Sequence, residues 1–470
     1  MRTRRIHLIS PRTDAVVARP IYLNRALCAP LAGLVAVAAL VPRDQYEVVL
    51  TDENVEPVDF ALKADLVGIS AVTSHVKRAY KLADAFRSRG VAVILGGVHP
   101  SFMPTEALQH ADAVVVGEAE GVMERVLEDL KGGRLGGIYK AGELPSLAGI
   151  PIPRYDLLKP HRYLNRAVIQ TSRGCPHGCS FCTEHLLNGL ALRSRPIDEV
   201  LRDIRSAGER QIILSDPDLF CSRTRALTLM QALRGMGIRW QASVDSRSLL
   251  DEQLLDLAAE SGCYMLAIGF EWIFREAAQN GHRPWRRLEA FPLLVEKVRS
   301  SGILVFGQFV FGFDHDRPSV FEDTVQLAIR AGVDVGSFSI RTPYPGSRIW
   351  FEMLNAGRIT TYDWDRYDQR NLVFRPLGLT AEEIRDGHAN ALEQFYSLRS
   401  LLARFPGFGS GSRLDWTLYN LFFKKGTRRS ASADHPPEPA EVQVPPHHAI
   451  PPVMPRMRGW ERLILEEAPL

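Results

Sequence analysis

The sequence contains no apolar run long enough to cross a membrane. Its best candidate, LAGLVAVAALV at residues 31–41, is about half of the roughly 20 residues that a spanning helix needs. The basic start, MRTRRIHLIS, leads into proline and polar residues without the apolar core of a secretory signal. These two absences predict a cytoplasmic protein with no transmembrane segment.

Charge of either sign is not in excess, and cysteine is scarce. Lys and Arg number 57 against 54 Asp and Glu, and the net charge of +3 argues against bulk electrostatic binding to nucleic acid. The chain has six cysteines in 470 residues. In a reducing compartment, thiols that do gather are expected to bind a metal or act in catalysis rather than form disulfides.

The first 140 residues alternate short apolar runs with amphipathic stretches. Four runs are typical of buried strands: residues 47–52, 65–72, 91–97 and 113–117. This rhythm predicts an α/β fold, a Rossmann-like parallel sheet with helices on both faces. Ligands of such sheets bind beyond the carboxyl ends of the strands.

Small and polar residues occupy those carboxyl ends, in SAVTSH, GGVHPS and GEAE. Glycine there lets a ligand approach the backbone closely, although it also serves tight loops. The candidate ligand contacts are Ser70, Thr73, Gly96, Gly97, His99, Gly117 and Glu118.

A second series of strands follows a proline-rich linker at residues 141–165. Its apolar runs are residues 167–172, 211–216, 239–244, 264–271, 303–313 and 336–342. These six βα units, within residues 166–350, predict a barrel or partial barrel with its chemistry at the carboxyl ends. Beyond it we expect a helical region at residues 351–410 and a partly disordered tail at residues 411–470.

Three cysteines, Cys175, Cys179 and Cys182, lie in one loop directly after the first strand of this series. A zinc site prefers four ligands, often from two Cys-x2-Cys pairs, and the sequence has no second pair. Three thiolates suit an iron–sulfur cluster, which normally takes four, and would leave one iron open. A zinc site completed by His177 and His185 is the alternative.

The motif CPHGCSFC resembles the Cys-x3-Cys-x-aromatic-Cys signature of the radical S-adenosylmethionine (SAM) superfamily. The N-terminal half is similar to the cobalamin-binding domain that precedes the barrel in one branch, as VILGGVHPS and VVVGEAEG show. The resemblance covers roughly residues 5–400, including FVFGFDHD and RTPYPGSRIW in the second half.

The resemblance implies that the three cysteines hold a 4Fe–4S cluster and that SAM chelates its open iron. The implied SAM contacts are Phe181, Asp216, Asp218, Gly269, Glu271, Gly312 and Phe313. The three acids among them also fit loop solvation or a helix cap. Cobalamin would lie over the seven candidate contacts of the first domain, although the familiar Asp-x-His-x-x-Gly motif is absent. No catalytic residue is assigned.

The implied activity is cobalamin-dependent methylation of an unactivated carbon, in a specialised metabolite or a lipid-like, apolar substrate. A cobalamin-independent radical SAM reaction (ring closure, oxidation or rearrangement) is one alternative, and a non-catalytic iron–sulfur module is another. The expected partners are a small molecule and an electron donor such as flavodoxin or ferredoxin, without nucleic acid. If methyl transfer occurs, Ser70, Thr73, Gly97 and His99 should face Cys179 and Glu271 across a shared cavity, which helices after Trp350 partly close.

Overall fold

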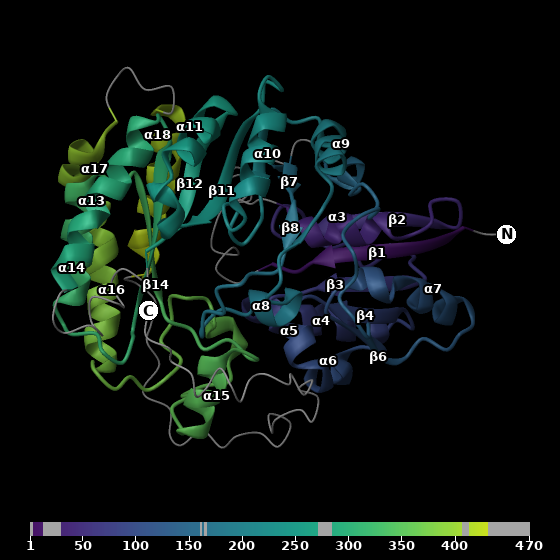
Figure 1. Cartoon of the computed structure of the whole chain (residues 1–470). Coiled ribbons are helices and arrows are strands. Elements are labelled where there is room, and N and C mark those ends of the chain that lie inside the picture. Colours follow the sequence, from purple (N-terminus) through teal and green to yellow (C-terminus); the bar gives the residue numbers. More distant parts are fainter. Residues whose placement is uncertain are drawn as a thin grey trace.

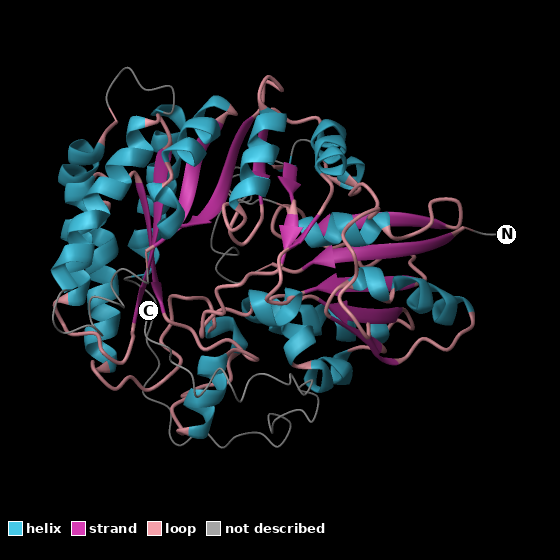
Figure 2. Cartoon of the chain, in the orientation of Figure 1, coloured by secondary structure: helices cyan, strands magenta, loops and turns pink. Residues whose placement is uncertain are grey.

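Two α/β lobes lie side by side in the protein, the N-terminal one drawn in purple and blue and the second in teal and green (Figure 1). The computed structural model describes residues 3–12, 30–159, 162–163, 167–270, 284–406 and 413–430. Each lobe has its own group of strands with helices around it (Figure 2). Across the described ranges, no helix combines the length and the hydropathy needed to span a bilayer.

The N-terminal sheet has six parallel strands in the order β2-β1-β3-β4-β5-β6. Their bounds are β1 (Arg4–Ser10), β2 (Tyr46–Asp52), β3 (Leu66–Ser70), β4 (Ala92–Gly96), β5 (Ala113–Val116) and β6 (Gly137–Lys140). The four predicted strands are confirmed. The pattern missed β1, which begins with two arginines and carries His7, and β6, which is short and mostly exposed.

Helices cover both faces of this sheet. Helix α3 (Ala32–Ala39) packs on β1, while α4 (Val76–Arg87), α5 (Val98–Phe102) and α6 (Pro104–His110) lie on the opposite side (Figure 1). The chain therefore leaves β1 toward β2 on one face and continues from β3 on the other. The reversal between β1 and β3 is the switch point at which open α/β sheets bind ligands.

The second sheet is also all parallel, in the order β14-β13-β12-β11-β10-β7, so its first and last strands lie at opposite edges. The strands are β7 (Ala167–Ile169), β10 (Gln211–Leu214), β11 (Arg239–Asp245), β12 (Cys263–Gly269), β13 (Leu304–Phe311) and β14 (Val335–Ile340). All six predicted strands are present, and the fold is the open partial barrel with βα units. A small antiparallel pair, β8 (Ser172–Arg173) and β9 (Arg193–Ser194), follows β7.

The remaining helices surround the two sheets. They are η1 (Thr73–His75), η2 (Ala119–Gly121), α7 (Met123–Lys131), η3 (Tyr155–Leu157), α8 (Glu184–Asn188), α9 (Ile197–Ala207), α10 (Arg223–Leu233), η5 (Ser246–Leu250), α11 (Glu252–Glu260), α13 (Pro284–Ser300), α14 (Val320–Ala331), α15 (Arg348–Asn355), η6 (Trp364–Arg366), α16 (Ala381–Phe395), α17 (Leu398–Arg404) and α18 (Arg413–Ser430). Helix α18 falls in the stretch that the sequence assigned to the tail. The proposed domain boundaries stay predictions.

The strands of the partial barrel have a buried apolar face and a half-buried face that mixes polar side chains with apolar ones, among them Phe306 and Val310. On β14, Phe338 stacks on Phe309 of β13 and meets Phe395 of α16 on the outside. Ser337 and Ser339 alternate with it and are half-buried. The same alternation on β11 and β13 leaves Gln241, Ser243, Asp245 and Gln308 half-buried. The inner wall is therefore not packed like a closed barrel core.

Helix α18 covers the amino ends of two barrel strands. Trp416 packs with Tyr264, Met265 and Leu304, residues near the starts of β12 and β13. Asn420 donates a hydrogen bond to the carbonyl of Asp334 at 3.0 Å. These contacts cover the amino side, so access to the inner wall is favoured from the carboxyl side.

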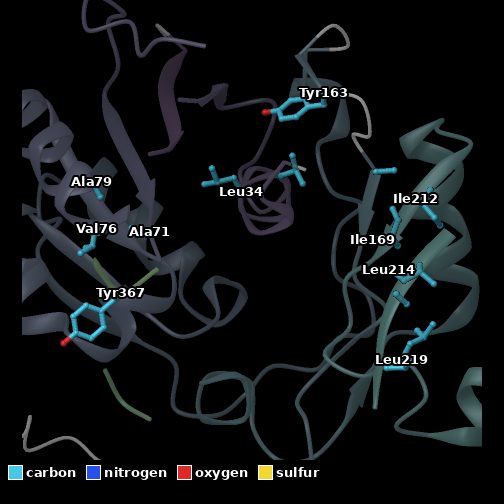
Figure 3. Close-up of a cluster of buried hydrophobic side chains, with 14 of the residues drawn as sticks. Leu34, Ala71, Val76, Ala79, Tyr163, Ile169, Ile212, Leu214, Leu219 and Tyr367 are labelled. Atoms are coloured by element: carbon cyan, nitrogen blue, oxygen red, sulfur yellow. The ribbon is translucent and has the colours of Figure 1, made fainter. Parts of the chain in front are cut away.

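A single buried hydrophobic cluster extends through both lobes. Leu34 of α3, Ile69 of β3 and Ile169 of β7 all belong to it. Figure 3 shows Leu34 together with Ile169, Ile212 and Leu214 of the second sheet. Because the buried apolar cluster is continuous across the boundary between the two lobes, the lobes pack against each other and are not separate domains joined only by a linker.

We expect acid to destabilise the protein partly through His7. Burial lowers the pKa of His7 from 6.5 to about 4, and its ring contacts the Thr51 hydroxyl at 2.9 Å. The unfolded chain binds the proton more readily, so this contribution is present above pH 6.5 and is lost as pH falls toward 4. Denaturant titrations at several pH values should show a loss of up to about 1.4 kcal/mol per pH unit from this group.

The matched variant His7→Gln keeps a polar side chain but has no group at this position that titrates between pH 4 and 6.5. Its unfolding free energy should change less with pH between 6.5 and 4 than that of the wild type. Identical slopes for the two proteins would contradict a buried, neutral His7.

Candidate active site

A cavity of about 270 Å³ lies against the α3 side of the N-terminal sheet and reaches the first residues of the barrel. Its wall includes Ser70, Gly97 and Glu118 at the carboxyl ends of β3, β4 and β5. The barrel contributes Gln170 and Arg173, which follow β7. The carboxyl edge of the first sheet and the start of the barrel therefore share one wall.

Missing side chains create this cavity. Gly68 and Gly96 lie on the same face as Leu8 and Ile94, and all four line the cavity. A Cβ on Gly96 would find nothing nearer than Val115 Cβ at 3.7 Å, so the fold does not require glycine there for packing. The facing helix α3 adds small residues to the wall, including Gly33. The hollow fits an apolar or flat group lying on the backbone.

Gly97 has a different role. Its φ of 94° lies in the left-handed region, and an added Cβ would be 2.8 Å from the carbonyl oxygen of Ala71. The turn after β4 therefore requires glycine. Glycine is needed at position 97 because the loop after β4 passes close to Ala71 in the loop after β3. This requirement does not depend on a bound ligand.

Five of the seven predicted ligand contacts line the cavity: Ser70, Gly96, Gly97, Gly117 and Glu118. Thr73 and His99 are not part of its wall. His99 is 1% exposed and packs edge-on against Trp364, with ring centroids 5.0 Å apart. Its side chain is directed to the packing between the first lobe and η6, because α5 turns it away from the strand end.

The three cysteines lie on the loop between β8 and β9, and all are half-buried thiols outside any disulfide. Cys175 donates its N–H to the carbonyl of Gly189, and Cys182 donates to that of Cys179, both at 3.1 Å. Ile349, at the start of α15, donates to the carbonyl of Ser180 at 3.1 Å. Backbone hydrogen bonds within the loop and one from helix α15, which follows the barrel, therefore fix the conformation of the loop.

Burial and mutual repulsion disfavour the thiolates without a cation. Burial raises the pKa of Cys182 to about 11, with smaller contributions from Cys179 and Cys175, and it also raises the pKa of Cys175. Iron would supply the compensating charge. Within the described residues, no three His, Cys, Asp or Glu side chains converge on one ion. A cluster, in which each thiolate binds a different iron, does not need that convergence.

His177 anchors the loop to the neighbouring strands. Its Nε2 lies 2.9 Å from Asp218 Oδ2, and its Nδ1 lies 2.9 Å from Arg247 Nη2. Asp218 Oδ1 accepts the backbone N–H groups of Phe220 and Asp245 at 3.1 and 3.2 Å. Both oxygens of Asp218 are therefore used within the protein, and both His177 nitrogens have partners other than a zinc ion.

Asp216 joins the end of β10 to the end of β7. Its two oxygens accept the N–H and hydroxyl of both Thr171 and Ser172. The side chain is buried, and desolvation raises its pKa despite those four hydrogen bonds. These contacts favour a role in positioning the chain that enters the cysteine loop over direct contact with SAM.

The other predicted SAM contacts lie at carboxyl ends of barrel strands or in the cysteine loop. The Gly269 carbonyl accepts a hydrogen bond from the Ser246 hydroxyl at 3.0 Å. Gly312 and Phe313 donate their N–H groups to Asp316 at 2.8 and 3.0 Å. Phe181 is half-buried in the cysteine loop. Glu271 lies outside the described residues.

A buried ion-pair network joins the cavity wall to the base of the cysteine loop. Arg173 Nη1 donates to Glu118 Oε2 and Nη2 to Glu120 Oε1, both at 2.6 Å, and Nε donates to Gln170 at 2.7 Å. Arg193, paired with Arg173 across β8 and β9, also binds Glu118. Burial would lower the pKa of Arg173, but the two carboxylates raise it.

Sequence reasoning missed the arginines of this network and Glu120. Only two local features of the sequence pointed to these residues. Arg173 lies two residues before Cys175, and Glu120 follows Glu118 in GEAE. Their pairing joins parts of the chain more than 50 residues apart, so local patterns do not report it.

The comparisons with known proteins agree with this architecture. Residues 18–127 match the B12 binding domain family. The chain is 29% identical over 418 residues to bacteriochlorophyllide d C-12(1)-methyltransferase of Chlorobaculum tepidum, a match that covers 86% of this chain and 90% of the relative.

Two solved structures share the fold. The radical S-adenosylmethionine methyltransferase TsrM from Kitasatospora setae, with cobalamin and a 4Fe–4S cluster bound, superposes with a TM-score of 0.65 at 16% identity, covering 91% of this chain and 100% of TsrM. The cobalamin-dependent S-adenosylmethionine radical enzyme OxsB superposes with a TM-score of 0.55 at 16% identity, and the match covers 70% of this chain and 52% of OxsB.

These matches define the class as α/β proteins in which a B12-type domain precedes a partial barrel with a three-cysteine loop. The chain thus has a B12 binding domain match at residues 18–127 and shares its overall fold with solved radical SAM enzymes that bind cobalamin.

We expect Gly96→Leu to empty the cavity of cobalamin while leaving the fold intact. The new side chain fills the hollow, and overpacking costs about 1–3 kcal/mol, so affinity should fall roughly tenfold or more. Bound cobalamin is measured from the visible spectrum after anaerobic purification, and iron content reports the cluster.

Gly142→Leu is the control, because a Cβ on this linker glycine would meet nothing within 4 Å. It should bind cobalamin as the wild type does. Full cobalamin occupancy in Gly96→Leu would place the cofactor elsewhere.

We expect Asp216→Ala to destabilise the protein and to lose the cluster. The change leaves two backbone N–H groups and two hydroxyls without their buried acceptor, which should lower the unfolding free energy by about 3 kcal/mol or more. Asp216→Asn keeps one acceptor oxygen, so its unfolding free energy and iron content should lie between those of the wild type and those of Asp216→Ala. Denaturant titration and iron analysis are the measurements, and an Ala variant with wild-type values of both would contradict the anchoring role.

Proposed function

We propose that the protein is a cobalamin-dependent radical SAM enzyme that methylates an unactivated carbon of a small molecule. The observation that carries this proposal is the shared wall: the cavity at the carboxyl edge of the B12-type domain and the cysteine loop meet at Arg173. A methyl carrier and a radical source must act on one substrate, and a cavity wall that includes Arg173, two residues before Cys175, supports such an arrangement. The named methyltransferase relatives support the same reaction class.

The residues present fit both cofactors. Cys175, Cys179 and Cys182 would hold the 4Fe–4S cluster, since they are half-buried, outside any disulfide and on one loop. The hollow over Gly68 and Gly96 would hold part of cobalamin. When bound, the cluster supplies the electron that cleaves SAM to a 5′-deoxyadenosyl radical, and cobalamin supplies the methyl group.

The inner wall of the partial barrel indicates the kind of substrate. Gln308, Ser337 and Ser339 line its half-buried face at β13 and β14. We expected a largely apolar substrate from the sequence. Phe306 and Val310 share the face of Gln308, and Ser339 already donates to Gln369 Oε1 at 3.4 Å, so the wall suits a substrate that carries both apolar and polar groups.

Turnover also requires electrons from outside the chain. We propose a small electron-transfer protein, a flavodoxin or ferredoxin, as the donor. The tip of the cysteine loop, Pro176 to Gly178, is exposed and is the accessible approach to the thiols.

Cys179→Ala tests the proposal most directly. Removing one thiolate from the three should abolish the brown chromophore and the formation of 5′-deoxyadenosine from SAM under reducing, anaerobic conditions. The control is Cys263→Ala, which removes a buried thiol at the start of β12, the end of the strand opposite the cluster loop. It should keep both properties.

A Cys179→Ala protein with full iron content and normal SAM cleavage would overturn the cluster assignment. Wild-type protein that cleaves SAM but takes up no cobalamin would instead favour a ring closure, oxidation or rearrangement.

A further inference from the structure

The base of the cysteine loop is fixed to the wall of the cavity from both of its strands. Arg173 on β8 and Arg193 on β9 face each other in the antiparallel pair. Both guanidinium groups bind Glu118, which follows β5 in the N-terminal sheet. The loop that carries the thiols thus begins after Arg173 and ends before Arg193, and the Glu118 carboxylate binds both arginines.

Arg173 has no freedom to adjust on its own. Each of its three nitrogens donates to a different acceptor, Glu118, Glu120 or Gln170. All of these residues line the cavity, so a group that fills it lies against the same network. A bidentate or tridentate guanidinium contact is sensitive to direction as well as distance.

The chain between Arg173 and the first thiol is equally constrained. Only Gly174 lies between Arg173 and Cys175, and its φ is 92°. A Cβ on Gly174 would be 2.3 Å from the carbonyl oxygen of Ala191, so the two sides of the loop are in close contact. A displacement of Arg173 therefore moves Cys175 rather than being absorbed by the backbone.

We propose that Arg173 is a positioning residue that couples occupancy of the cavity to SAM binding at the cluster. A cavity ligand that stabilises one arrangement of Glu118 and Glu120 stabilises one position of Arg173, and hence of Cys175. By linkage, SAM must change the affinity for the cavity ligand by the same factor. This inference rests on the proposed function, because it takes the cysteine loop as the SAM site.

The experiment measures SAM affinity of cluster-reconstituted full-length protein by equilibrium dialysis, with and without hydroxocobalamin. We expect the wild type to show at least a 5-fold difference, the lower end of typical coupling. Arg173→Lys keeps the buried positive charge but not the fork that bridges two carboxylates. In this variant the difference should fall below about 2-fold, with SAM affinities compared at matched iron content and at saturating hydroxocobalamin.

Lys77→Gln is the matched control. Lys77 forms another ion pair between the two lobes, with Asp363 at 2.8 Å and Asp365 at 3.0 Å, away from the loop and the cavity wall. Its coupling should equal that of the wild type.

The outcomes separate this inference from the proposed function. Wild-type protein that cleaves SAM and binds hydroxocobalamin, yet binds SAM equally well with and without it, overturns the coupling and leaves the function standing. Undiminished coupling in Arg173→Lys overturns the role of Arg173. Absence of SAM cleavage in every protein would instead refute the proposed function.

Discussion

Two carboxylates, buried Glu118 and largely buried Glu120, tie the N-terminal lobe to the base of the cysteine loop. Glu118 and Glu120 leave the N-terminal sheet at the end of β5, and Arg173 reaches them from the start of the cysteine loop. If either side were shifted, charges would remain buried without partners, a cost of several kcal/mol. These ion pairs are directional, unlike apolar packing, and together with other polar contacts such as Lys77–Asp363 they favour one relative position of the two lobes.

From this position follows the geometry of the site. Each lobe is an open parallel sheet, and each offers ligands its carboxyl edge. The network joins the carboxyl edge of the first sheet to Gln170 and Arg173 after β7, so both lobes contribute to the wall of the glycine-lined cavity. Helix α18 covers the amino side of the second sheet, and α15 is tied to the cysteine loop through Ser180. A two-cofactor reaction needs such an enclosed, shared space more than it needs any single residue.

Prediction from the sequence succeeded where the signal was local and failed where it depended on partners. All six barrel strands and four strands of the first sheet follow from short apolar runs. Strand β1 was missed because His7 and two arginines interrupt its pattern, although its carboxyl half is fully buried. Asp216 and Asp218 are SAM contacts implied by the family resemblance, a prediction that stays untested, and in the structure their oxygens accept hydrogen bonds from, or lie beside, groups of the protein itself. His99 was assigned to the cavity from its place after a strand end, yet it packs against Trp364.

The sequence by itself determined the spacing of the three thiols, the alternation of strands and helices and the glycines at the strand ends, because each of these is encoded by neighbours in the chain. Tertiary structure alone decided which polar residues face a ligand and which hold the protein together. Glu118 shows the difference: its place after β5 was readable, but its two arginine partners come from residues 55 and 75 positions away. A charge buried in a low-dielectric interior takes whatever partner the fold supplies, and that choice is made only when distant segments meet.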